Sequence, residues 1–175
     1  MIGFSQTVGY AIRALACIPL VGTNEPARIE EIAECTGIPR PYLARVLHSL
    51  ALKGLVITKR GRTGGLYLPR PSEEISVKEI IFAVEGPEVF RRCIWGVEEC
   101  SDTRGCPAHE MWVRFRENLE RQLERMTLAQ VAQFERVRSC LVCHKTSACE
   151  IPPTKGVQHG RTQLKRRGKH RERCA

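Results

Sequence analysis

Apolar residues recur at helical spacing in three segments of the first half of the chain. A first helix is predicted over 5–20, with Pro19 expected to end it, and a shorter second helix over 28–36. A third helix begins near Pro41, a residue type suited to a first helical turn, and ends at Gly54. The positions expected to face a common core are Val8, Ala11, Ile12, Leu15, Ala16, Ile29, Ile32, Ala33, Leu43, Val46, Leu47 and Leu50.

The hydrophobic period changes after the third helix. Two short strand-like runs, "LVITKR" at 55–60 and "LYLPR" at 66–70, flank the glycine-rich turn "RGRTGG". This pattern predicts a β-hairpin with a basic tip. Three helices followed by such a hairpin are typical of a winged helix-turn-helix, in which the third helix enters the major groove of DNA. The fold class is therefore mainly α with a small β-hairpin wing.

The basic and polar residues that the pattern leaves outward on the third helix and the wing are the candidate DNA contacts. Phosphate contacts supply affinity, and contacts to base edges supply sequence preference. Charged residues on an exposed helix face are more often merely solvated, so the prediction depends on the order of elements and not on one side chain. The candidates are Arg40, Tyr42, Arg45 and His48 on the helix and Arg60, Arg62 and Thr63 at the turn.

The second half of the chain is predicted to be helical. Ser76 and Glu79 form a capping box that opens a helix over 76–86, and 108–126 reads as one long amphipathic helix. A second capping box starts at Thr127. Because the long helix has little of its own chain to cover its apolar stripe, we expect it to pair with a twin helix in a symmetric homodimer. Packing of the stripe on its own winged helix is the alternative.

The net charge of +9 is concentrated at the C-terminus. Residues 151–175 contain eight Lys or Arg and one acid, which gives +7 and leaves +2 for the first 150 residues. We expect 139–175 to be a basic, mostly disordered tail that adds affinity for an anionic partner. No run of eighteen apolar residues is present, which argues against a membrane span, and no set of catalytic residues suggests an enzyme.

Nine cysteines and no convincing secretory signal indicate a reducing, cytoplasmic protein, where clustered cysteines more often bind metal or sense redox state than form disulfides. The densest group, "CIWGVEECSDTRGCPAH" at 93–109, has the spacing C-x6-C-x5-C-x2-H. A second group, Cys140, Cys143 and Cys149, contains one CxxC, which either binds a metal or is a set of unstructured thiols. Cys17 and Cys35 are expected to be small, buried or part-buried residues.

Four segments together carry a family resemblance: "FSQTVGYAIRAL", "LALKGLVITKRGRTGGLYL", "ISVKEIIFAVEG" and "CIWGVEECSDTRGCPAHEMW". Over about residues 3–137 the chain resembles the Rrf-type winged-helix transcription regulators, the group that includes IscR-like and NsrR-like members. The resemblance implies a homodimer that binds a pseudo-palindromic site in double-stranded DNA. It also implies an iron–sulfur cluster, [2Fe–2S] in this case, held by Cys93, Cys100, Cys106 and His109.

Two departures from the family pattern limit what the resemblance implies. Val8 stands where NsrR-like members take a ligand from the partner subunit, and valine cannot ligate iron. The start of the third helix, "PRPYLA", lacks the serines and the acidic residue of IscR-like members, so a different operator is expected. Gaps of six and five residues suit a loop around a cluster better than the CxxC knuckles of structural zinc. A zinc site on the same ligands and metal-free reactive thiols remain alternatives.

The expected organisation follows the chain: a DNA-binding domain over 1–70, a linking helix over 71–92, the cluster loop over 93–109, dimerisation helices over 108–138, and the tail. The predicted function is that of a repressor whose DNA affinity depends on the cluster, which senses cluster supply, nitric oxide or redox stress. A cluster-free thiol- or zinc-dependent regulator is the alternative. A small electron-transfer protein is a weaker one, since it leaves the basic wing unexplained.

Overall fold

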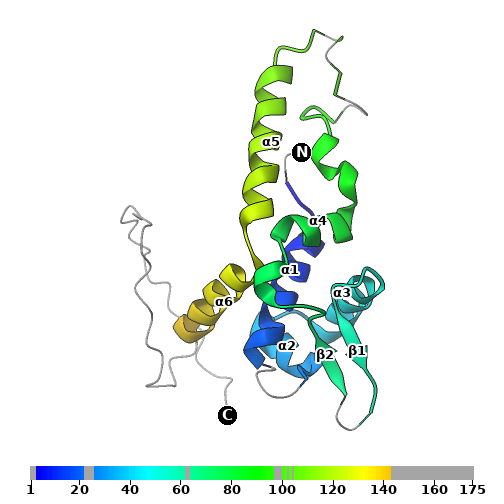
Figure 1. Ribbon diagram of the computed structural model, residues 1–175, viewed down its shortest axis with the longest axis vertical. Coiled ribbons are helices and arrows are strands. Elements are labelled where there is room, and N and C mark those ends of the chain that lie inside the picture. Colours follow the sequence, from blue (N-terminus) through cyan, green and yellow to red (C-terminus); the bar gives the residue numbers. More distant parts are fainter. Residues whose placement is uncertain are drawn as a thin grey trace.

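The computed structural model describes residues 3–21, 26–61, 64–96, 100–101, 103 and 105–142, with side chains described as far as Val137. A winged helix-turn-helix forms one end of the molecule, and a long helix, α5 (His109–Arg125), extends away from it (Figure 1). The predicted fold class, mainly α with a β-hairpin, is confirmed. Arg62, Thr63 and the tail beyond Val142 lie outside the described residues.

The winged helix-turn-helix consists of α1 (Gln6–Val21), α2 (Ile29–Thr36), α3 (Arg40–Leu52), β1 (Ile57–Lys59) and β2 (Gly65–Tyr67). Its core is built from the apolar stripes of the three helices and closed by residues that follow α3. The stripes are the predicted ones, because a 3.6-residue period leaves a helix only one face to bury. Leu15, Ile32, Leu43 and Leu50 are among the largest fully buried side chains.

The wing is a two-stranded antiparallel sheet in which Ile57 pairs with Tyr67 and Lys59 with Gly65. Ala27 adds a short bridge to Leu66 on the other side of β2, through backbone hydrogen bonds of 3.1 and 2.9 Å. A Cβ at position 65 would lie 2.6 Å from Cβ of Pro26, so glycine is required for this close approach. The bridge therefore anchors the wing to the segment that leads into α2.

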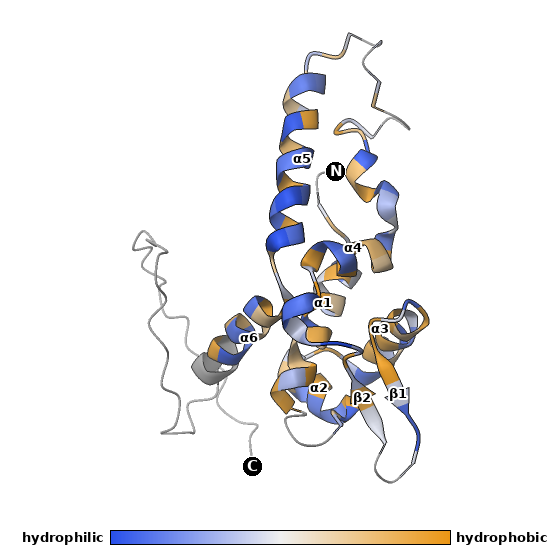
Figure 2. Cartoon of the chain, in the orientation of Figure 1, coloured by the Kyte–Doolittle hydropathy of each residue, from blue (hydrophilic) through white to orange (hydrophobic). Residues whose placement is uncertain are grey.

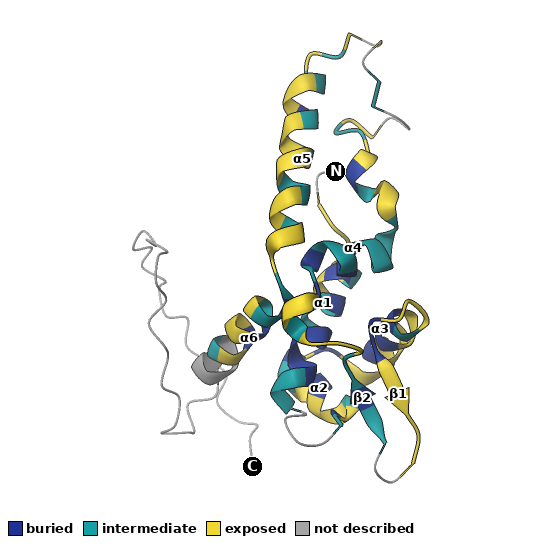
Figure 3. Cartoon of the chain, in the orientation of Figure 1, coloured by how far each residue is buried: buried dark blue, intermediate teal, exposed yellow. Residues whose placement is uncertain are grey.

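The second half begins with a short 3-10 turn, η1 (Ser72–Glu74), followed by α4 (Val77–Glu85) and a second turn, η2 (Pro87–Arg91). α5 lies beside α4 and η2, and it presents a mostly exposed outer face (Figure 3). The small core here gathers residues of α1, α4, η2 and α5, and it is distinct from the winged-helix core. Its members include Val8, Val77, Ile81 and Phe90, with Leu119 and Leu123 packed against them.

The two predicted capping boxes differ in outcome. Ser76 caps α4 by accepting a hydrogen bond from the Glu79 amide at 3.1 Å, but the Glu79 side chain pairs with Arg70 instead of completing the box. Thr127 and Gln130 form the reciprocal arrangement, with hydrogen bonds of 3.0 and 3.4 Å. The second box directs the chain sharply from α5 into α6 (Leu128–Val142).

α6 packs on α1 within the winged-helix core, which differs from the expectation that 108–138 forms the dimerisation helices. Leu128 is fully buried there. Glu135, only 2% exposed, pairs with Arg13 of α1 at 3.1 Å, and Arg13 also donates to the carbonyl of Thr36 at the end of α2. The bonds from Arg13 thus join α6, α1 and α2, and α6 continues past residue 139, where the tail was predicted to start.

Two further expectations are corrected. α1 continues through Pro19 to Val21, because a proline in the last turn removes a hydrogen bond at a point where the helix is already ending. Cys17 is fully buried and Cys35 half-buried, as expected, but they form a disulfide between α1 and α2 with their Cα atoms 6.5 Å apart. The contact between these two helices places the cysteines within bonding reach.

Candidate DNA-binding surface and cysteine loop

The outward face of α3 carries the four predicted contact residues, in two different situations. Arg45 and His48 are exposed in the middle of the helix. Arg40, the first residue of α3, is also exposed, but its guanidinium pairs with Glu30 of α2. Sequence reasoning did not select Glu30, because an acidic residue does not suggest DNA binding. Its carboxylate nevertheless offsets the charge of Arg40.

Tyr42 is held by α1, although it lies among the candidate DNA contacts. Its hydroxyl is hydrogen-bonded to that of Thr7 at 2.7 Å, and its ring packs edge-on against Tyr10 with centroids 5.3 Å apart. The side chain remains 37% exposed. Tyr42 therefore joins the first turn of α3 to the first turn of α1, a connection that the sequence pattern did not suggest.

A groove of about 450 Å³ separates α2 and α3 from the wing. His48 lines it together with two basic residues that the sequence reasoning missed, Arg28 before α2 and Lys59 at the end of β1. Lys59 also lies over the ring of Tyr67, 5.0 Å from its centroid. Arg60 is exposed beside the groove. The adjacent positions of Lys59 and Arg60 in the sequence were the available signal for a basic wing.

The start of the cysteine loop is anchored by α5. Trp112 Nε1 donates to the carbonyl of Arg92 at 2.8 Å, and Arg116 donates to the carbonyl of Arg91 at 3.1 Å. Both acceptors immediately precede Cys93. Trp112 is only 9% exposed and stacks on Phe115. A small apolar pocket of about 80 Å³ lies below this anchor, lined by Phe4, Phe90, Cys93 and Trp112 among others.

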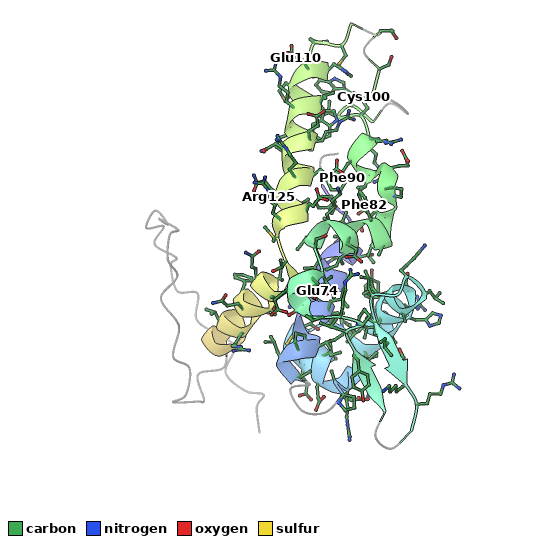
Figure 4. All side chains as sticks on the ribbon, in the orientation of Figure 1. Glu74, Phe82, Phe90, Cys100, Glu110 and Arg125 are labelled. Atoms are coloured by element: carbon green, nitrogen blue, oxygen red, sulfur yellow. A yellow bond between two sulfur atoms is a disulfide. The ribbon has the colours of Figure 1, made fainter. Side chains whose placement is uncertain are left out.

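The structure brings together Cys93, Cys100 and His109 where the loop meets the start of α5. Cys100 Sγ lies 3.1 Å from His109 Nδ1, and Cys93 is close enough to raise the pKa of the Cys100 thiol. Figure 4 shows Cys100 beside the end of α5 that carries Glu110. Cys106 precedes α5, and its carbonyl accepts a 3.1 Å hydrogen bond from the His109 amide.

Burial raises the pKa of the Cys100 thiol above its ordinary value, and the nearby Arg116 guanidinium partly opposes that increase. Neighbouring Cys93 and Cys106 raise the same pKa further, because like charges disfavour a second thiolate. The sulfurs are therefore close enough to influence one another electrostatically. Binding of a metal at Cys100 has to displace its proton.

The donor types at the loop fit an iron–sulfur cluster, since Cys thiolates are the usual ligands and an imidazole replaces a thiolate in some centres. Their arrangement is not that of a formed site: within the described ranges, no three or more His, Cys, Asp or Glu residues are placed so that they could hold a metal ion. Residues 97–99, 102 and 104 of the loop lie outside those ranges. In the part of the chain that the structure describes, no helix has the length and apolar character required to cross a bilayer.

Comparisons with known proteins agree with this architecture. The model of the Rrf2 family, described as an iron-dependent transcriptional regulator, matches residues 4–133. The regulator NsrR of Oceanobacillus iheyensis is 38% identical over 98 residues, which cover 55% of this chain and 67% of NsrR. IscR of Photorhabdus laumondii is 30% identical over 128 residues, which cover 73% of this chain and 77% of IscR.

Among solved structures, CymR, described as the global cysteine regulator of Bacillus subtilis, superposes with a TM-score of 0.65. The match covers 77% of this chain and 98% of CymR at 24% sequence identity, which supports the fold. The family match spans most of the chain, from the start of α1 to the middle of α6, and takes in both the winged helix and the cysteine loop. The chain therefore belongs to the Rrf2 family of DNA-binding transcriptional regulators.

Proposed function

We propose that this regulator is a repressor whose affinity for DNA is controlled by a [2Fe–2S] cluster bound at Cys93, Cys100, Cys106 and His109. One observation carries the proposal: Cys100 Sγ lies 3.1 Å from His109 Nδ1, and Cys93 and Cys106 are close enough to raise the pKa of the Cys100 thiol. The description of the family as iron-dependent supports the same choice of metal.

The chain contributes three things to such a site: the ligands, a backbone that is held in place just before Cys93, and an apolar pocket beside it. Trp112 and Arg116 hold the backbone just before Cys93, so that ligand would be positioned before the cluster arrives. The apolar pocket lined by Phe4 and Phe90 limits water on one side. A bound cluster supplies a centre whose oxidation state and integrity respond to redox stress or nitric oxide.

DNA binding is proposed to use α3 in the major groove and the wing on the adjacent backbone. Arg45 and His48 are exposed at the middle of α3, where a recognition helix presents side chains to base edges. Lys59 and Arg60 extend from the wing, with Arg62 and Thr63 beyond them in the sequence, and are proposed to bind phosphates.

We further propose a homodimer formed along α5. Met111 and Phe115, which lie one turn apart, are 56% and 46% exposed, an unusual exposure for large apolar side chains on a helix rich in charge. Figure 2 shows α5 as mostly hydrophilic, with separate hydrophobic patches along it. A second copy of α5 would cover these residues and place two winged helices on the half-sites of one operator.

The cluster proposal is tested by anaerobic purification followed by visible spectroscopy and by iron and acid-labile sulfide analysis. Wild-type protein should contain two irons and two sulfides per subunit, and Cys93→Ala, Cys100→Ala and Cys106→Ala should each lose the visible absorption. Cys140→Ala, in the tail, is the matched control and should retain it. A cluster that persists in Cys106→Ala but disappears in Cys140→Ala contradicts the proposal.

The role of His109 can be examined separately. His109→Ala should yield a cluster that forms but is lost faster in air, since one of four ligands is missing. His109→Cys should lower the reduction potential, because a thiolate replaces a neutral imidazole. An unchanged potential in His109→Cys would exclude His109 as a ligand.

A metal-free thiol regulator is the second candidate. The likeness to CymR of Staphylococcus aureus, which is 26% identical and whose structure is also known in an oxidised form, favours it. It predicts protein without iron or sulfide that still binds DNA, with an affinity that changes when the loop cysteines are oxidised or alkylated.

A further inference from the structure

A buried carboxylate outside the proposed cluster ligands connects two distant parts of the chain. The side chain of Glu85, at the end of α4, is only 8% exposed. Its Oε1 accepts a 2.6 Å hydrogen bond from the backbone amide of Ser5, the residue before α1. Its Oε2 pairs with Arg92 Nη1 at 3.2 Å. A carboxylate buried to this degree normally has specific partners, and here the partners belong to separate segments.

The Arg92 side of this contact leads directly into the cysteine loop. Arg92 precedes Cys93, and its own carbonyl is held by Trp112 Nε1 at 2.8 Å. Backbone and side chain of Arg92 are thus fixed at two points. A rearrangement of the loop that moves Cys93 has to move Arg92, and the ion pair to Glu85 would follow or break.

The Ser5 side of the contact leads to the recognition helix. Thr7 lies in the first turn of α1, two residues after Ser5, and its hydroxyl is hydrogen-bonded to that of Tyr42 at 2.7 Å. Tyr42 lies in the first turn of α3, and its ring also packs on Tyr10 of α1. Ser5, directly before α1, therefore contacts Glu85, and the first turn of α1 contacts α3.

We propose that Glu85 is a positioning residue that transmits the conformation of the cysteine loop to the recognition helix within one subunit. The route runs from Arg92 to Glu85, from Glu85 to the start of α1, and from Thr7 to Tyr42. The inference rests on the proposed function, because it supplies the path by which the state of the loop reaches DNA. It assigns Tyr42 a role in orienting α3 in place of a contact to a base.

The two contacts of Glu85 differ in strength: the one to Ser5 is strong, and the one to Arg92 is weak enough to break. The bond from the Ser5 amide to a buried carboxylate is charge-assisted and short, so α1 should follow Glu85. The ion pair to Arg92 is exposed on the arginine side, where the side chain is 61% exposed, so it can open and close. The ion pair between Arg92 and Glu85 can therefore form or break without unfolding α1.

The first test measures the ratio of DNA dissociation constants between cluster-loaded and cluster-free protein. Glu85→Gln retains an acceptor for Ser5 but removes the charge that pairs with Arg92, and Thr7→Val removes the hydroxyl that meets Tyr42. Coupling between sites in proteins typically changes affinity by about 5- to 150-fold, and each variant should reduce the wild-type ratio at least about threefold toward one. Arg92→Lys keeps the positive charge and Thr7→Ser keeps the hydroxyl, so these two variants should retain most of the wild-type ratio. Glu88→Gln, an exposed carboxylate in the same segment, is the matched control and should leave the ratio unchanged.

The second test needs neither cluster nor DNA. Amide hydrogen exchange in cluster-free full-length protein should speed up in the first turns of both α1 and α3 in Glu85→Gln, and in α3 in Thr7→Val. Glu88→Gln should change neither. Faster exchange confined to α1 in Glu85→Gln would overturn the path, as would a wild-type affinity ratio retained in both Glu85→Gln and Thr7→Val. If cluster-loaded and cluster-free wild-type protein bind DNA with equal dissociation constants, the proposed function fails. The hydrogen-exchange result still decides whether the loop is linked to α3.

Discussion

Among single residues, Cys100 shows most directly how environment sets chemistry at the loop. Burial raises the pKa of its thiol, and Arg116 acts in the opposite direction. A thiol is a ligand and a nucleophile only as its thiolate, so both its reactivity and its capacity to bind iron depend on this balance. The spacing of the cysteines in the sequence identified Cys100 as a candidate ligand but contained no information about Arg116.

We expect the rate of Cys100 alkylation in cluster-free protein to rise with pH and to reach its midpoint above the ordinary thiol value. Arg116→Gln should move this midpoint higher still, because the cation that favours the thiolate is removed. Iodoacetamide labelling followed by peptide mass spectrometry measures the rate at each pH. Unfolding in urea should abolish the difference between the two proteins. A midpoint that falls in Arg116→Gln would contradict the assignment.

Glu135 gives a second test at the residue scale. It is buried against Arg13, so Glu135→Ala leaves a part-buried guanidinium without that carboxylate and should reduce the free energy of unfolding by about 3 kcal/mol. Arg136→Ala, an exposed neighbour on the same helix, should change it by less than about 0.5 kcal/mol. Urea denaturation of both variants provides the comparison. Equal small effects would show that the pair does not hold α6 to α1.

Between elements, one lysine of α4 adds ion pairs to the apolar packing of α5 on α4. Lys78 Nζ lies 2.9 Å from Glu120 and 3.5 Å from Glu124 on α5. The hydrogen bond that the Lys78 ammonium donates to Glu120 is the main cause that raises the pKa of Lys78, and partial burial opposes it. The ammonium also lies over the ring of Phe82, 5.4 Å from its centroid. These contacts fix the C-terminal half of α5 relative to α4.

Lys78→Met should therefore destabilise the protein by about 1 kcal/mol near pH 7. Because the folded-state pKa lies above that of the unfolded chain, the stabilisation by Lys78 is fully present below about pH 10.4 and is lost as pH rises through the folded value. The difference in unfolding free energy between wild type and Lys78→Met should be constant from pH 6 to 9 and shrink above pH 10.5. A difference that grows with rising pH would contradict this account.

The elements themselves were largely predictable from the sequence, whereas their contacts were not. Helix and wing assignments depend on local periodicity and turn residues, and Leu43, Val46, Leu47 and Leu50 are all buried as predicted. The Cys17–Cys35 disulfide, the pairing of Arg40 with Glu30 and the docking of α6 on α1 depend on the angles at which helices pack. Packing angles are set by side chains from several segments at once, and no local pattern encodes them.

At the scale of the whole molecule, the winged helix shares one core with α6, while α5 extends away from that core with large apolar side chains exposed (Figure 3). This division suits a protein that reads DNA with one part and pairs with a second copy through another. The cysteine loop lies where the chain enters α5. A change in the loop could therefore affect both the recognition helix and the relation between subunits.

If the proposed dimer forms along α5, Phe115→Arg should convert it to a monomer, because a charge in that apolar contact would be buried without a partner. Glu117→Arg introduces the same side chain on another, exposed face of α5 and should leave the dimer intact. Light scattering coupled to size-exclusion chromatography measures the molar mass. A dimer that persists in Phe115→Arg would place the interface elsewhere.

The most direct test of the central claim is the affinity for an operator fragment, selected from random DNA, of the anaerobically purified protein with and without its iron and sulfide. The two forms of wild-type protein should differ in dissociation constant by at least about fivefold, and Cys106→Ala should bind with the affinity of the cluster-free form under both conditions. Identical affinities for wild-type protein with and without the cluster would contradict control of DNA binding by an iron–sulfur centre.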